Sequence, residues 1–192
     1  MLKKLLPLAL LAVAGTASAD AYLGGGIGQS SMDVQPLEAP GVYSSVTDTD
    51  NAIKLFGGFE FNRSLALEVG FIHFGEHGVD YTNGVDTAYE RVETTATYLA
   101  LIGALPLGPG ASLYGKVGFA SWYQDYTISD AWGAYWVDEA VGVDPMIGVG
   151  LQIDAGPISL RAEAERYLDV GDVTLIGKSD IDVISANAIF WF

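Results

Sequence analysis

Few side chains in this sequence are suited to catalysis or to metal binding, and the two histidines, His73 and His77, are the first to consider. In an extended chain they would lie about 13 Å apart, too far to bind one metal ion. Cysteine is absent, which excludes disulfides and thiolate metal sites. No twelve-residue calcium-binding motif is present either. We therefore expect no cofactor, no metal site and no enzyme activity.

The other ionisable residues alternate with apolar ones. Residues 52–75 contain two runs of about ten residues joined by a turn at 62–64, and Lys54, Glu60 and Glu68 lie on the side opposite the large apolar residues. Side chains alternate across a strand, so this pattern predicts a hairpin with one apolar face. A soluble sandwich has the same alternation. The length of the runs decides, because tilted transmembrane strands need about 9 to 11 residues and soluble strands about 5 to 6.

Similar runs extend over the rest of the chain. Strands are predicted at 20–30, 52–61, 65–75, 95–107, 111–122, 145–153, 158–167 and 183–192, with polar loops at 31–51, 76–94, 123–144 and 168–182. Long loops thus alternate with short turns, which is typical of outer-membrane barrels. We predict an all-β fold, an eight-stranded antiparallel up-and-down transmembrane β-barrel with short periplasmic turns and four long outer loops. The inward face of 95–107 stays open, because both sides are mostly apolar.

The composition agrees with an exported membrane protein. Residues 1–19 carry two lysines, a short apolar run and a small-x-small end, which predicts a secretory signal cleaved after Ala19; a membrane anchor is the alternative. The barrel domain would then be 20–192, in the outer membrane of a Gram-negative cell. No later run is apolar for the roughly 18 residues of a membrane helix. The formal charge of −15 argues against nucleic acid as a partner, because binding phosphates needs a basic surface.

The chain resembles the eight-stranded transmembrane domain of outer-membrane protein A and the wider OmpA-like or porin family. The resemblance is carried by YLGGGIG at 22–28, LFGGFEFNRSLALEVGF at 55–71, LYGKVGFA at 113–120, IGVGLQI at 147–153 and SLRAEAERY at 159–167. It implies an ion-pair network inside the barrel, with Glu68 and Arg161 at matching positions and Gln152 where the family often has an acid. It also implies that Phe190 and Phe192 form the C-terminal signal read by the barrel assembly machinery, although Asn187 stands where that signal often has glycine.

The inward face predicts a filled lumen. It gathers the charged or polar residues Lys54, Glu60, Glu68, Lys116, Gln152, Arg161, Glu163 and Glu165 among many glycines. An eight-stranded barrel is only wide enough for side chains to fill its interior. We expect a plug of paired charges in which Glu68 pairs with Arg161, because a buried unpaired charge is costly. Two separately solvated charges near a mouth are the alternative.

The outer loops contain most of the 24 acidic residues, with only Arg91 and Lys178 as bases. Beside outer-membrane lipids and lipopolysaccharide, these acids could bind bridging divalent cations, or they could simply be solvated. The loop at 123–144 is rich in Tyr and Trp, which suits either an adhesive surface or a cap on the barrel.

The functional prediction is a small OmpA-like integral outer-membrane barrel with a structural, envelope-integrity or surface-interaction role. A narrow porin that passes small solutes is the alternative. A lipid A-modifying enzyme is less favoured, although small barrels that resemble this one include such enzymes. His73 has no serine two residues further on, as deacylases of that type do.

Overall fold

The computed structural model describes residues 20–33, 42–129, 135–171 and 177–192. The regular structure of these residues consists of the strands β1 (Asp20–Met32), β2 (Tyr43–Thr47), β3 (Thr49–Asn62), β4 (Leu65–Thr82), β5 (Thr87–Gly108), β6 (Ala111–Ser129), β7 (Tyr135–Ala155), β8 (Ile158–Val170) and β9 (Ser179–Trp191). Within these residues there is no helix of the length and apolarity needed to span a membrane.

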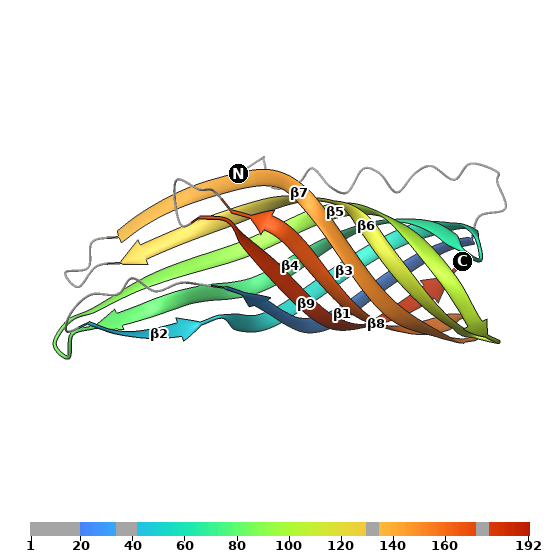
Figure 1. The fold of residues 1–192 in the computed structure, drawn as a ribbon, viewed down its shortest axis with the longest axis horizontal. Helices are drawn as coiled ribbons and strands as arrows, with labels where there is room; N and C mark the ends of the chain where they lie inside the picture. Colours follow the sequence, from blue (N-terminus) through green and yellow to red (C-terminus); the bar gives the residue numbers. More distant parts are fainter. Residues whose placement is uncertain (1–19, 34–41, 130–134, 172–176) are drawn as a thin grey trace.

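Eight of the strands close a ring in which each strand is antiparallel to both neighbours. The order is β1-β3-β4-β5-β6-β7-β8-β9, and the pairing of β1 with β9 completes the circuit (Figure 1). A closed ring leaves no sheet edge to be exposed to hydrocarbon. The predicted eight-stranded up-and-down barrel is confirmed.

The remaining strand, β2, continues the line of β3 on the far side of Asp48. Both strands pair with β4: Ile53 lies opposite His73, and Val46 lies opposite Val79. The ring is therefore extended at this end by strand pairing that goes on beyond it.

An irregularity in β4 marks the joint between the two parts. Gly75 has a φ of +85°, a left-handed conformation that glycine adopts without steric cost. The Asp50 carboxylate accepts a hydrogen bond from the backbone N–H of Glu76 at 2.7 Å and fixes this bend. Even-numbered residues of β4 are buried up to Phe74, whereas His77 and Val79 are buried beyond the bend. The bulge thus exchanges the two faces of the strand.

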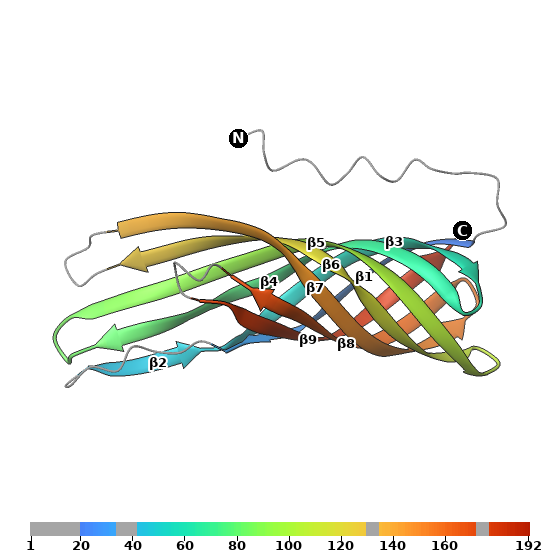
Figure 2. The ribbon, with the colours of Figure 1, turned by 45° about the horizontal axis from the view of Figure 1, so that its top comes forward.

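The predicted loops are wrong over much of their length. Strand β4 runs on to Thr82 and β5 begins at Thr87, so most of 76–94 is a hairpin; β6 and β7 likewise extend to Ser129 and from Tyr135. Figure 2 shows these hairpins projecting well past the ends of β8 and β9. In water, strand pairing does not require a lipid-facing apolar side, so the alternation that revealed the membrane strands is missing here. The predicted signal at 1–19 and parts of three loops lie outside the described residues.

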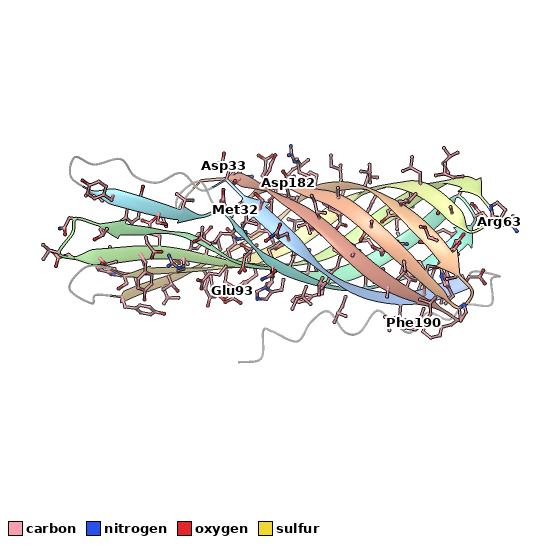
Figure 3. The ribbon with its side chains drawn as sticks, turned by 90° about the horizontal axis from the view of Figure 1, so that it is seen from below. Met32, Asp33, Arg63, Glu93, Asp182 and Phe190 are labelled. Atoms are coloured by element: carbon pink, nitrogen blue, oxygen red, sulfur yellow. The ribbon has the colours of Figure 1, made fainter. Side chains whose placement is uncertain are left out.

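The outside of the ring is apolar and its inside is polar. Exposed outward side chains include Ile27, Leu55, Phe71, Leu99, Phe119, Val149, Leu160 and Ile184. Farther along most strands the outward side chains are polar, among them His73, Glu93, Arg166 and Asp182, whereas β7 keeps exposed valines at 137, 141 and 143. Figure 3 places Arg63 and Phe190 toward one end of the long axis and Glu93 and Asp182 nearer the middle. The apolar band therefore covers one part of the molecule's length, and the outer strands project beyond it.

The inward face of β5, which the sequence left open, is now assigned. Tyr98, Ala100 and Ile102 are buried, whereas Leu99 and Leu101 are exposed.

Candidate functional site

Six charged side chains meet inside the ring and form what we call the charge cluster: Lys54 of β3, Glu68 of β4, Lys116 of β6, and Arg161, Glu163 and Glu165 of β8. All six are buried, none more than 5% exposed. Three cations face three carboxylates, so the cluster has no net charge. Each strand brings these residues inward by its simple alternation.

Glu68 is the centre of one half of the cluster. Its Oε2 accepts a hydrogen bond from Arg161 Nη1 at 2.6 Å, across the lumen from β4 to β8, and its Oε1 accepts one from Lys116 Nζ at 2.7 Å. The hydroxyls of Tyr22 and Tyr98 donate to the same carboxylate at 2.9 and 2.8 Å. A carboxylate with four donors is well compensated for its loss of water.

Glu163 and Glu165 organise the other half. Lys54 Nζ donates to Glu163 at 2.6 Å and to Glu165 at 2.7 Å. Lys116 Nζ donates to both carboxylates at 2.9 Å and so joins this half to Glu68. Tyr114 Oη adds a bond to Glu163 at 2.6 Å. One lysine therefore contacts all three acids of the cluster.

Gln152 adjusts the charge balance. Its Oε1 accepts hydrogen bonds from Arg161 Nε and Nη2 at 3.2 and 2.9 Å. An acid here, as the resemblance leads one to expect, would give four anions for three cations. The amide supplies the acceptor that the guanidinium needs without adding a charge.

Two groups of predicted site residues lie elsewhere. Glu60 is half-buried at the mouth beside the short turns, and no hydrogen bond or ion pair of its carboxylate is found among the described residues. Phe190 and Phe192 are exposed at the end of β9. The cluster therefore brings together Lys54, Glu68, Lys116, Arg161 and Glu163, with Gln152 beside it, but not Glu60.

Sequence reasoning missed the tyrosines that support the cluster. Tyr22 is directly opposite Gly58 in the strand register, Tyr98 is opposite Gly70, and Tyr114 is opposite Gly150. A Cβ on any of these glycines would come within about 2.4 Å of the facing tyrosine ring or hydroxyl. The rings lie over bare backbone, and their hydroxyls reach the glutamates. An inward tyrosine paired with an inward glycine was the available signal.

An apolar layer fills the lumen on the outer side of the charge cluster. It consists of Ile72, Phe74, Met146, Tyr167, Ile181 and Val183, all of them buried. Phe74 of β4 and Tyr167 of β8 meet edge to face across the lumen, with ring centroids 4.8 Å apart. Met146, Tyr167 and Ile181 are consecutive partners across three strands. Alternation predicted which residues point inward but not that apolar ones gather at one depth.

Cavities lie on either side of these two layers. One of about 700 Å³ opens at the short-turn end, lined by Tyr22, Glu60, Ile102, Tyr114, Arg161 and Trp191 among others. A smaller one of about 340 Å³ lies at the outer end, lined in part by Met32, Val92, Tyr126 and Lys178. The charge cluster and the apolar layer fill the lumen between them.

The sequence matches the family model of the OmpA-like transmembrane domain over residues 16–192. The chain belongs to this family. Similar solved structures include Ail of Yersinia pestis (14% identity, TM-score 0.57, 91% of this chain and 99% of that one) and Neisserial surface protein A (10%, 0.58, 90% and 97%). OprG of Pseudomonas aeruginosa is a third (15%, 0.56, 93% and 98%). At such low sequence identities, the structural similarity shows a common fold. No curated protein matches in sequence.

Family and fold together place this OmpA-like barrel in the outer membrane of a Gram-negative bacterium. The apolar band of the ring then faces lipid. The projecting hairpins lie on the side opposite the short turns, which is the outer side in barrels of this kind.

The two histidines of this OmpA-like domain lie on opposite faces of β4. His73 is on the exterior, with Nε2 3.2 Å from Glu93 Oε1. His77 is buried in the interior, with Nε2 3.2 Å from Ser30 Oγ, and that hydroxyl also donates to the Phe74 carbonyl. Burial lowers the pKa of His77 below its ordinary value. Among the described residues no three His, Asp or Glu side chains are grouped to hold a metal ion.

Proposed function

We propose that this OmpA-like barrel is a non-enzymatic component of the outer membrane, with a role in envelope integrity or surface interaction, and that its lumen is closed to solutes. The observation that carries the proposal is the pair of filled layers in series, the charge cluster and the apolar layer. A permeating ion would have to displace buried ion pairs in one and lose its hydration in the other.

A narrow porin is the second candidate. It is favoured by the cavity at the short-turn end, which solutes could enter from that side of the membrane. That cavity ends at Arg161, whose guanidinium is bonded to Glu68 and Gln152. Passage would require this pair to open, and the apolar layer beyond it to part as well. We therefore expect conduction only when both layers are breached.

Planar-bilayer recordings test the proposal. Wild-type protein should give no unitary channels, and neither should Glu60→Gln, which changes the cavity but not the cluster. A double variant, Glu68→Ala with Phe74→Ala, should conduct if it folds, which its heat-modifiable migration on gels would establish. Uniform channels from wild-type protein would support the porin instead.

We also propose that the protein has no catalytic activity, because its histidines are not placed beside an accessible nucleophile. Among the described residues the serine found in contact with a histidine is Ser30, which is fully buried, as is His77, and a lipid substrate would not reach them. His73 lies beside a glutamate rather than a nucleophile. Lipid A acylation should be unaltered in a deletion strain, and an altered acylation pattern restored by the wild-type gene would contradict this.

We propose the partners of the protein from where each part of the barrel lies relative to the membrane. Outer-membrane lipids and lipopolysaccharide would surround the apolar band. The signal at 1–19 would be cleaved after Ala19, and Phe190 and Phe192 would present the C-terminal signal to the assembly machinery.

Ail has been solved with the heparin analogue sucrose octasulfate, a polyanion. Here the outer part is rich in acids, so we propose a preference for cations, including divalent ones, over polyanions. A thermal midpoint unchanged by EDTA would count against bound divalent cations.

A further inference from the structure

The outer half of the molecule is an open sheet. Beyond the ring, β2, β4, β5, β6 and β7 remain paired in that order, through Tyr43 opposite Thr82 at one side and Ser129 opposite Tyr135 at the other. We call this the projecting sheet; it is visible at the left of Figures 1 and 2. A sheet that does not close has two edges.

The edge formed by β7 is the longer of the two. Strand β8 begins to pair with β7 at Met146, so among the described residues no strand lies beside 135–145 on the side away from β6. Along such an edge every second residue directs its N–H and C=O groups outward. The opposite edge, β2, is five residues long.

The side chains of this β7 edge are apolar and acidic. Tyr135, Val137, Val141 and Val143 are between 55% and 73% exposed, on the same face of the strand. Glu139, on that face too, lies opposite Asp125 of β6, so two like charges face each other. The edge therefore combines backbone groups that no described strand pairs with, an apolar row and a negatively charged pair of facing carboxylates.

We propose that the β7 edge, residues 135–143, binds an extended cationic segment of another protein by strand addition. Backbone pairing would satisfy the free N–H and C=O groups, alternate apolar residues of the segment would cover the valines, and its basic residues would balance Glu139 and Asp125. A second copy of this chain fits less well, because self-pairing would add more carboxylates to the same surface. The inference rests on the proposed surface role but not on the closed lumen.

Hydrogen exchange in the presence of a synthetic peptide tests the proposal. The protein is placed in nanodiscs of zwitterionic lipid, and the probe is a ten-residue peptide of alternating lysine and valine. Exchange at 135–143 should slow by about tenfold or more when the peptide binds, because its backbone would cover these amides. The matched control peptide has the same sequence with every backbone nitrogen methylated, so that it keeps its charge but cannot donate.

Two protein variants separate strand addition from general attraction. Glu139→Lys should weaken peptide binding by about tenfold, whereas Asp86→Lys, which makes the same charge change in the turn between β4 and β5, should weaken it less than about threefold. Equal effects, equal binding of the methylated peptide, or protection confined to β2 would overturn the proposal. Protection of 135–143 that rises with protein concentration without peptide would indicate self-pairing instead. None of these readouts depends on conductance, so they test strand addition independently of the proposal that the lumen is closed.

Discussion

The ring and the projecting sheet are built from the same strands but obey opposite rules. In the ring each strand is paired on both sides, its outward residues are apolar, and its buried charges balance three against three. In the projecting sheet the edges have no neighbouring strand among the described residues, and carboxylates such as Asp125 and Glu139 face each other across strands. The sheet is continuous between the two, so the surrounding solvent makes the difference.

Hydrocarbon forbids both a free edge and an uncompensated charge, whereas water tolerates both. We therefore expect a substitution inside the ring to change stability strongly and a similar substitution in the projecting sheet to change it little.

The largest effect should come from removing the hub of the charge cluster. Glu68→Ala leaves Arg161 and Lys116 without their shared carboxylate in a buried site, and should lower the free energy of unfolding by about 3 to 5 kcal/mol. Urea unfolding in lipid, followed by tryptophan fluorescence, measures this. Glu93→Ala, an exposed carboxylate of the outer part, should change it by about 0.5 kcal/mol or less. A loss below about 1 kcal/mol for Glu68→Ala would contradict the role assigned to the cluster.

The apolar layer comes next. Phe74→Ala removes the ring that contacts Tyr167 across the lumen and should cost about 3 kcal/mol, because the surrounding side chains cannot fully close the cavity. The matched change Phe119→Ala, on a lipid-facing side chain, should cost clearly less in the same assay. Equal costs would mean that Phe74 is not packed in the interior.

The tyrosine–glycine pairs give a smaller effect. Gly150→Ala places a Cβ about 2.3 Å from the Tyr114 hydroxyl and 2.6 Å from the Ala162 carbonyl, and this overpacking should cost about 2 kcal/mol. Gly115→Ala is the control, since its Cβ would meet no atom closer than 4.0 Å. If both substitutions are neutral, the tyrosines are free to move and do not position the glutamates.

The smallest effect is one of pH and concerns the joint between the two regions. The pKa of His77 is lowered by burial, so between that value and the ordinary value of about 6.5 the unfolded protein binds a proton that the folded protein does not. Stability should fall as the pH drops below about 6.5. Asp50 and Asp48 are the charged groups near this imidazole, and the pKa of Asp50 is lowered by the Glu76 N–H, so it titrates at much lower pH.

Amide exchange of residues 74–79 between pH 7 and 5, corrected for the intrinsic rate, measures this opening. His77→Gln should abolish the pH dependence, and His73→Gln, on the exterior, should retain it. If His73→Gln removed it instead, the exposed histidine would be the group responsible.

The sequence was sufficient to predict which side chains point into the barrel wherever the opposite side of the strand must be apolar to face lipid. The alternation that placed Lys54, Glu68 and Arg161 on one face of their strands is required by a lipid-facing apolar side, and the structure has them inside the ring. It was insufficient for β5, where both faces are apolar and only pairing with β4 decides that Tyr98 points inward.

Depth and the outer strands could not be predicted either. Alternation gives the side of a residue, not its height, so the meeting of Phe74 and Tyr167 was invisible. In the outer part, water removes the apolar requirement, and the bulge at Gly75 exchanges the faces of β4. A long polar hairpin consequently had the sequence pattern of a loop.

The absence of cysteine from the chain makes one measurement especially direct. One variant carries a single cysteine in place of Ala66, which lines the cavity at the short-turn end, and another carries one in place of Ile72, in the apolar layer. Each variant, in nanodiscs, is treated with a water-soluble thiol reagent. If the interior is closed, the cysteine at 66 reacts readily and the cysteine at 72 reacts at least about a hundredfold more slowly, as expected for a site that opens rarely. Equal rates at the two positions would show a continuous water path and contradict the filled barrel.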